Sequence, residues 1–194
     1  FPDLGKARAV AVAADGTLLA ASAGRLAFIT PDGTVERIVD VGNGDIVDIA
    51  VARSGHIGVL DGRSRALFIL KADGSMVRTV ENAFPSASGI GVFGSRFIVV
   101  SPSGGGLYAV APETGKIEPL GVSAPEVEGR AIQPSDVTQG PGGALYINDF
   151  ERKSIIVTRD GTAIDDRFAG LTGGGIAVPR LAAWGPLLFA TELL

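Results

Sequence analysis

The sequence predicts an all-β protein, and three observations lead to that prediction. Glycine accounts for 28 of the 194 residues, about twice its usual share of roughly 7%. Together with 11 prolines, these glycines leave no uninterrupted amphipathic stretch of helical length. Short runs of β-branched and aromatic residues alternate with turn sequences, and the turns recur at a regular interval along the chain.

Two interleaved series of glycines set an internal repeat of about forty residues. The first series consists of Gly33, Gly74, Gly115 and Gly161, each after Asp or Thr, at spacings of 41, 41 and 46 residues. The second consists of Gly16, Gly55, Gly94, Gly143 and Gly185, at spacings of 39, 39, 49 and 42. Asp-Gly supplies the positive φ that tight hairpin turns need. We therefore expect four antiparallel strands per period.

The second repeat shows this pattern most fully, with expected strands at Ile46–Ala52, His56–Leu60, Ala66–Leu70 and Ser75–Val80. A four-stranded repeat of about forty residues is typical of a β-propeller blade. The alternative, a β-sandwich, gives no reason for two glycine series to share one period. Dividing 194 residues by the 41-residue spacing gives about 4.7 blades in one domain. Their expected bounds are 7–44, 45–83, 84–130 and 131–167, with a partial blade at 168–194.

The last repeat lacks its two outer strands, because no second turn glycine follows Gly185 before Leu194. An open blade array exposes apolar sheet faces and unpaired strand edges. We therefore expect that an additional chain or segment completes the ring, and that the sequence is a subunit or fragment of a larger assembly.

Composition and charge exclude several classes of protein. The net charge is −4 with scattered basic residues, which argues against a nucleic-acid partner. There is no cysteine and one histidine, so thiolate and histidine-rich metal sites are excluded. No apolar run approaches the ~20 residues of a transmembrane segment. The chain begins at Phe1 without a leader pattern, so any signal was removed or never present; a periplasmic or secreted location is favoured over a cytoplasmic one.

Two repeats carry a recognisable motif. In residues 142–156 a glycine turn precedes an apolar strand ending in Asp149, then a loop with Arg152 and a second apolar strand. The second repeat matches it with Gly55, Asp61, Arg63 and Arg65. This pattern resembles the NHL and gluconolactonase-like group of six-bladed propellers, which implies about one further blade. The other repeats depart from it, with Ser22, Ser101 and Thr191-Glu192 at the Asp position.

The expected topology gathers one set of polar residues on one face of the propeller. The loops between second and third strands, and those entering the first strands, emerge there. The set comprises Asp45, Asp48, Asp61, Arg63, Arg65, Arg130, Gln133, Ser135, Asp136, Asn148, Asp149 and Arg152. Asp48 and Asp136 begin innermost strands near the central channel, so they are the main candidates for a polar ligand or, alternatively, a Ca²⁺-like ion.

Asp61 and Asp149, with Arg63 and Arg152, are further ligand candidates, but a structural role is favoured for the two aspartates. An Asp that ends a strand before a tight loop usually accepts hydrogen bonds from loop amides. His56 follows a turn on the opposite face, where we expect a solvated side chain. Gly104–Gly106 and Gly173–Gly175 are interpreted as blade-connecting loops, and Trp184 as core.

The resemblance implies ligand sets that this chain matches poorly. Gluconolactonase-like enzymes hold one cation with Glu, Asn and Asp, whereas Asn43, Asn82 and Asn148 are out of register with Asp48 and Asp136. Amidating lyases of the NHL group use several histidines. The sequence therefore favours a non-catalytic scaffold without a cofactor that binds a protein or carbohydrate. The alternative is a metal-dependent hydrolase or lactonase with calcium in the channel.

Overall fold

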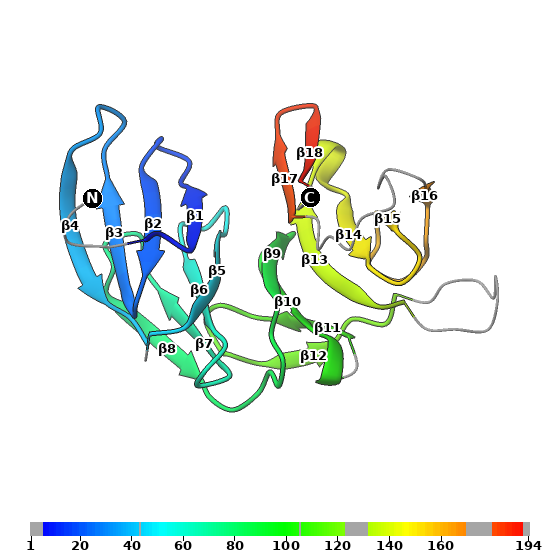
Figure 1. Ribbon diagram of the computed structural model, residues 1–194, viewed down its shortest axis with the longest axis horizontal. Helices are drawn as coiled ribbons and strands as arrows, with labels where there is room; N and C mark the ends of the chain where they lie inside the picture. Colours follow the sequence, from blue (N-terminus) through cyan, green and yellow to red (C-terminus); the bar gives the residue numbers. More distant parts are fainter. Residues whose placement is uncertain (1–5, 43, 105, 123–131, 170–179, 192–194) are drawn as a thin grey trace.

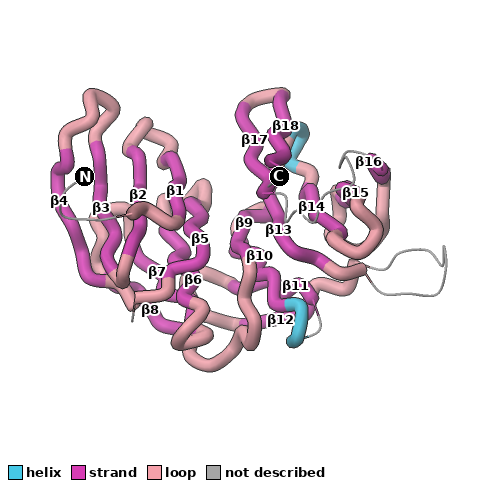
Figure 2. Tube along the Cα trace, viewed as in Figure 1, coloured by secondary structure: helices cyan, strands magenta, loops and turns pink. Residues whose placement is uncertain are grey.

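The computed structural model describes residues 6–42, 44–104, 106–122, 132–169 and 180–191. These residues form β-strands joined by short turns, with two 3₁₀ segments at Pro102–Gly104 and Pro141–Gly143 (Figure 2). No helix in these ranges is long and apolar enough to cross a membrane. The predicted all-β class is confirmed.

The first two blades are complete antiparallel meanders in which sequence neighbours pair in order. Blade 1 contains β1 (Ala9–Val12), β2 (Leu18–Ser22), β3 (Arg25–Ile29) and β4 (Val35–Asp40). Blade 2 contains β5 (Ile46–Val51), β6 (Ile57–Asp61), β7 (Ala66–Leu70) and β8 (Met76–Val80). The strands expected in the second repeat agree with blade 2 to within one residue at each end.

The next two blades repeat the meander, and a hairpin follows them. Blade 3 contains β9 (Gly89–Phe93), β10 (Arg96–Ser101), β11 (Gly106–Val110) and β12 (Ile117–Pro119). Blade 4 contains β13 (Pro134–Gln139), β14 (Leu145–Asp149), β15 (Ser154–Thr158) and β16 (Asp166–Ala169), and the hairpin contains β17 (Arg180–Trp184) and β18 (Leu187–Thr191). The fold is thus a propeller of four-stranded blades with a two-stranded fifth unit.

One loop prediction needs correction. Gly104 and Gly106 do not connect blades: Gly104 ends the 3₁₀ segment that follows β10, and Gly106 begins β11, both inside blade 3. In blade 4, Ser154 of β15 pairs with Ala169 at the end of β16. Gly173–Gly175 lies outside the described residues, as does the Trp184 side chain.

The turn glycines of both series have the backbone conformation that the repeat predicted. All of them, from Gly16 to Gly185, have φ between +53° and +90°. This is the left-handed region, which glycine adopts without a steric penalty. The glycine surplus is therefore largely explained by the hairpin turns of the blades.

The blades fan out around an open arc with their first strands innermost (Figure 1). Successive innermost strands β1, β5, β9, β13 and β17 lie against one another. Apolar clusters fill the interfaces between blades: Phe28 packs between blades 1 and 2, Phe97 between blades 2 and 3, and Ile147 between blades 3 and 4. These clusters hold the innermost strands side by side.

Apolar side chains remain exposed at the two ends of the arc. Val10 and Val12 on β1 are 61% and 54% exposed, and Leu187 and Phe189 on β18 are 54% and 51% exposed. Each pair lies on one side of its strand, because alternate residues face the same side. Both ends of the arc therefore present apolar sheet surface.

Candidate functional site at the mouth of the central channel

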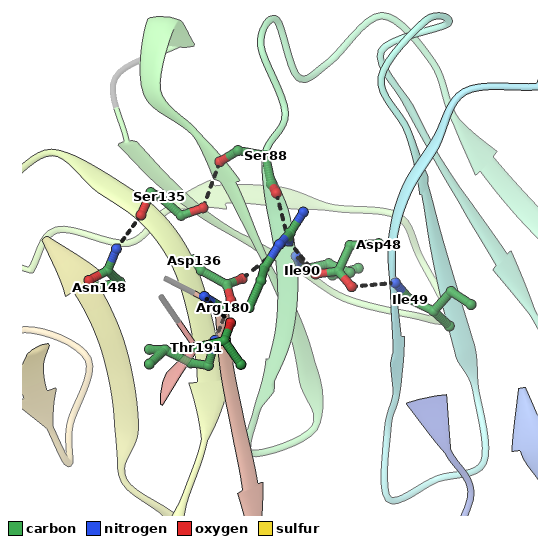
Figure 3. Close-up of polar contacts among 10 residues, drawn as sticks. Asp48, Ile49, Ser88, Ile90, Ser135, Asp136, Asn148, Arg180 and Thr191 are labelled. Atoms are coloured by element: carbon green, nitrogen blue, oxygen red, sulfur yellow. Dashed lines mark hydrogen bonds and ion pairs between the residues drawn. The ribbon is translucent and has the colours of Figure 1, made fainter. Parts of the chain in front are cut away.

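Asp48 lies near the start of β5, directly after a register shift that begins at Ile46. Such a bulge places an extra residue in one strand and re-aims the side chains beside it. The Asp48 carboxylate accepts hydrogen bonds from the amide of Ile49, at 2.9 Å, and from the amide of Ile90 in β9, at 3.0 Å (Figure 3). It thereby joins the innermost strands of blades 2 and 3.

Asp136 occupies the same position in blade 4 and repeats this contact. It follows a register shift that begins at Pro134 in β13. Its Oδ2 accepts a hydrogen bond from the amide of Leu181 in β17, at 2.7 Å. The Asp136 side chain is only 4% exposed. The two candidate aspartates therefore act alike, each bonding the next innermost strand.

Blade 3 has glycine where blades 2 and 4 have aspartate. Gly89 pairs with Val100, as Asp48 pairs with Leu60 and Asp136 with Asn148. A Cβ on Gly89 would lie 2.5 Å from Oδ1 of Asp136. The absent side chain thus leaves the space that the Asp136 carboxyl occupies.

Arg180 takes the equivalent position in the hairpin and reaches back toward blades 2 and 3. Its Nη1 donates to the Ser88 carbonyl at 3.1 Å, and lies 3.6 Å from Oδ2 of Asp48 and 3.8 Å from Oδ1 of Asp136 (Figure 3). The side chain is 47% exposed. One guanidinium therefore lies beside both candidate carboxylates and still meets solvent.

Both carboxyl groups have a raised pKa, and burial is the main cause for each. Burial raises the pKa of Asp136 to about 7, and the nearby Asp48 charge adds to this rise. Burial also raises the pKa of Asp48, against hydrogen bonds from Ile90 and the charge of Arg180. For Asp136 the raised pKa lies near neutral pH.

A chain of polar contacts supports this cluster from blade 4. The Asn148 side-chain amide donates to Oγ of Ser135. Ser88 Oγ donates to the Ser135 carbonyl at 2.9 Å, and the Ser88 carbonyl in turn accepts from Arg180. Ser135 and Asn148 were expected on this face, whereas Ser88 and Arg180 were not. Counting five residues back from Gly94 and Gly185 would have placed Gly89 and Arg180 in register.

Asp61 and Asp149 make the loop contacts expected of strand-ending aspartates. Both are fully buried. Oδ1 of Asp61 accepts the amides of Arg63 and Ser64, at 2.9 and 3.0 Å. Asp149 accepts the Gln133 amide at 3.3 Å and the Arg152 guanidinium at 2.9 Å. These carboxylates close their own loops, and neither joins the pair at the channel mouth.

The remaining predicted residues are spread over the same end of the blades. Asp45 pairs with Arg8 at 3.0 Å, and Arg63 and Arg65 are exposed in the β6–β7 loop. Arg130 lies outside the described residues. His56 is not solvated as expected: its side chain is 18% exposed, Nδ1 lies 2.9 Å from Ser54 Oγ, and Glu113 of blade 3 lies 3.9 Å away. Packing against the neighbouring blade covers it.

The donor set fits an internal ion-pair cluster better than a cation site. Among the described residues, no group of three or more His, Asp or Glu side chains is placed to hold a metal ion. Asp48 and Asp136 are the residues that would contribute to one, but three of their oxygen contacts go to backbone amides. The Arg180 guanidinium lies beside the remaining oxygen of Asp136. A positive side chain is thus already the counter-ion of both carboxylates.

Comparisons with known proteins identify the fold. No family model and no curated protein matches the chain. A catalytically inactive virginiamycin B lyase from Staphylococcus aureus with quinupristin superposes with a TM-score of 0.72 at 17% identity, over 96% of this chain and 63% of that one. The Myceliophteria thermophila Cps50 (Swd1) β-propeller domain gives 0.71 at 13% identity, over 97% and 64%.

A third solved structure is also similar to this chain. The Neurospora crassa Pan2 WD40 domain gives a TM-score of 0.63 at 11% identity, over 85% of this chain and 50% of that one. This chain spans less than two thirds of the length of each of the three. At such identities the likeness shows a β-propeller fold and nothing finer. The neighbours include both a lyase and WD40 domains, so function has to be argued from the site.

Proposed function

We propose that this propeller is a non-catalytic binding module that docks an acidic segment of a partner protein on the face at its channel mouth. The observation that carries the proposal is the set of exposed basic side chains on this face, Arg63, Arg65 and Lys153. Arg180 adds a guanidinium that Asp48 and Asp136 hold in place at 3.6 and 3.8 Å while it stays 47% exposed. A guanidinium fixed in this way presents N–H donors without losing side-chain entropy on binding.

The loops on this face support an acidic partner. Arg63, Arg65 and Lys153 are exposed in the β6–β7 and β14–β15 loops, alongside the single acidic residue Glu151. The whole chain carries −4, so this basic excess is local. Complementary charge increases association rate and selects the partner. A carbohydrate partner, the other expectation from the sequence, would be bound through hydroxyl groups with little dependence on salt.

Charge reversal on each face tests the proposal. Arg63→Glu reverses the charge of an exposed side chain and keeps the backbone amide through which Arg63 binds Asp61. Lys71→Glu is the matched control, because it makes the same charge change in the exposed turn between β7 and β8, at the other end of the strands. We expect an Asp/Glu-rich peptide, followed by fluorescence anisotropy, to bind about tenfold more weakly to Arg63→Glu and unchanged to Lys71→Glu. Equal binding to both variants, or none to the wild type, would contradict the proposal.

The finer resemblance to NHL-type repeats forms part of this proposal. Its support is the pair of buried aspartates, Asp61 and Asp149, each of which closes a loop that carries an arginine. The proposal also includes an additional chain or segment that completes the ring, because Val10, Val12, Leu187 and Phe189 are exposed at the ends of the arc. A second copy of this chain could be the one that completes the ring, and sedimentation at increasing protein concentration tests this. We expect the wild type to form dimers and Phe189→Asp to stay monomeric.

A further inference from the structure

The three interfaces between the four blades share one pattern. In each of them, an apolar residue of the first strand of one blade packs against the blade before it. This residue is Ile49 in blade 2, Ile90 in blade 3 and Val137 in blade 4, and each is at most 5% exposed. Each belongs to the apolar cluster that joins its blade to the preceding one. The pattern shows which neighbour the first strand of a blade is shaped to receive.

Val10 holds the same position in blade 1 but lacks this neighbour. It pairs with Ala20, two residues before the end of β2, just as Ile49 pairs with Val59, two residues before the end of β6. Val10 is nevertheless 61% exposed, whereas Ile49 is 5% exposed. Blade 1 therefore leaves open an apolar face that is covered in each of the three other blades.

The turns between the third and fourth strands give the same result independently. A Cβ added to Gly74, Gly115 or Gly161 would lie between 2.5 and 3.2 Å from a side chain of the preceding blade. The nearest side chains are, in the same order, those of Phe28, Arg78 and Leu120. Gly33 is the equivalent glycine of blade 1, and apart from its chain neighbours no described residue lies within 4 Å of its Cβ position. The space that a preceding blade fills elsewhere is therefore empty beside blade 1.

The same interfaces define the chemistry of the neighbour. In each of them the preceding blade contributes two alternate apolar residues of its third strand, and these are at most 3% exposed. They are Leu26 and Phe28 in the first interface, Leu67 and Ile69 in the second, and Leu107 and Ala109 in the third. A two-stranded hairpin such as β17–β18 has no third strand that could supply them. The neighbour that fits blade 1 is therefore a complete blade.

We propose that the open face of blade 1 docks a complete four-stranded antiparallel blade, whose third strand packs apolar side chains against Val10 and whose outer strands fill the space at Gly33. The inference rests on the part of the proposed function in which an additional chain or segment completes the ring, and it names the element of that chain or segment that contacts blade 1. Burial of the apolar surface of both sheets drives such docking. The same contact already holds each pair of successive blades together.

A fused blade tests the proposal. A second copy of residues 45–83, which contain blade 2, is joined ahead of Phe1 of the full chain. Residues 81–83 and 1–8 then link the last strand of the copy to β1, and this link is longer than residues 81–88, which join blades 2 and 3. Because a single blade cannot bury its own apolar face, the copy should fold only by docking. A copy of residues 7–44, which contain blade 1, gives a second version of the fused blade and should behave alike.

Val10→Asp measures whether the fused blade covers the face. In the wild type, at a concentration at which sedimentation finds monomers, we expect Tm to change by no more than about 2 °C, because Val10 is exposed. In the fused protein the same substitution buries a carboxylate, so Tm should fall by about 5 °C or more. Val35→Asp is the matched control, because the equivalent Met76 and Ile117 stay exposed in the covered blades 2 and 3. It should have no effect in either protein.

Gly33→Ala measures the contact at the turn. Its φ of +90° makes the substitution costly in both proteins, but only a docked blade adds a clash, so the loss in Tm should be larger in the fused protein. An equal effect of Val10→Asp in both proteins, or no effect in either, would overturn the proposal, as would failure of both fused blades to dock. Binding of the acidic peptide is measured on the channel-mouth face, so either result can fail while the other holds.

Discussion

The carboxylate of Asp136 accepts a hydrogen bond at 2.7 Å from the backbone amide of Leu181, 45 residues further along the chain. Asp48 makes the equivalent bond to Ile90, 42 residues away. In both cases a carboxylate on one innermost strand accepts a backbone amide of the next innermost strand. The channel mouth is thus held together by bonds between blades, and the same carboxylates orient Arg180.

Gly89→Ala tests whether the missing side chain in blade 3 makes room for Asp136. The new Cβ would lie 2.5 Å from Oδ1 of that buried carboxyl, so either the carboxyl or β9 has to move. We expect a loss of roughly 1–3 kcal/mol in the free energy of unfolding, measured by chemical denaturation. Gly121→Ala is the control, because nothing lies within 4 Å of its Cβ position. Equal effects of the two substitutions would contradict the steric argument.

Asp136→Asn tests the titration of the buried carboxyl. Because its pKa is raised to about 7 in the folded protein, the native state binds more protons than the unfolded state between pH ~4 and ~7. Wild-type stability should therefore fall relative to Asp136→Asn across this range, by up to ~1.4 kcal/mol per pH unit, and level off above pH ~7. Asp40→Asn is the control, because it removes the same charge from an exposed residue at the end of β4 and so measures the effect of net charge alone. A difference between wild type and Asp136→Asn that is independent of pH would refute the assignment.

Arg180→Met tests whether the positive charge of the guanidinium stabilises the negative charges of Asp48 and Asp136. Its removal leaves Asp48 and Asp136 without their cation. We expect a loss of about 1–2 kcal/mol, less than for a fully buried pair because Arg180 is half exposed. In a double-mutant cycle with Asp136→Asn the two losses should not add. Additive losses, measured by denaturant unfolding, would show that the two side chains are energetically independent.

Calcium titration tests the alternative of a metal in the channel. Since Arg180 already pairs with both aspartates, we expect millimolar Ca²⁺ to leave the Tm of the wild type unchanged. In Arg180→Met the carboxylates lose that counter-ion, and a rise in Tm with Ca²⁺ should be confined to this variant. A calcium-dependent rise in the wild type would instead favour the metal-dependent reading.

Much of the fold could be predicted from the residues alone, for a local reason. A hairpin turn with positive φ requires glycine within a few residues of chain, so Gly33 and Gly74 mark their turns directly. The same holds for two contacts of Asp61, whose carboxylate accepts the amides of Arg63 and Ser64, two and three residues further along the chain. Turn glycines and loop-closing aspartates depend only on residues close to them in the chain, so they can be predicted from a single sequence.

The channel mouth depended on contacts that no local pattern encodes. The sequence placed Asp48 and Asp136 near the channel, yet it did not show that Arg180, 132 and 44 residues further on, lies beside both. The sequence by itself determined the repeat and its turns, whereas the tertiary structure decided which side chains meet, because the stacking of blades brings together residues of equal register from separate repeats.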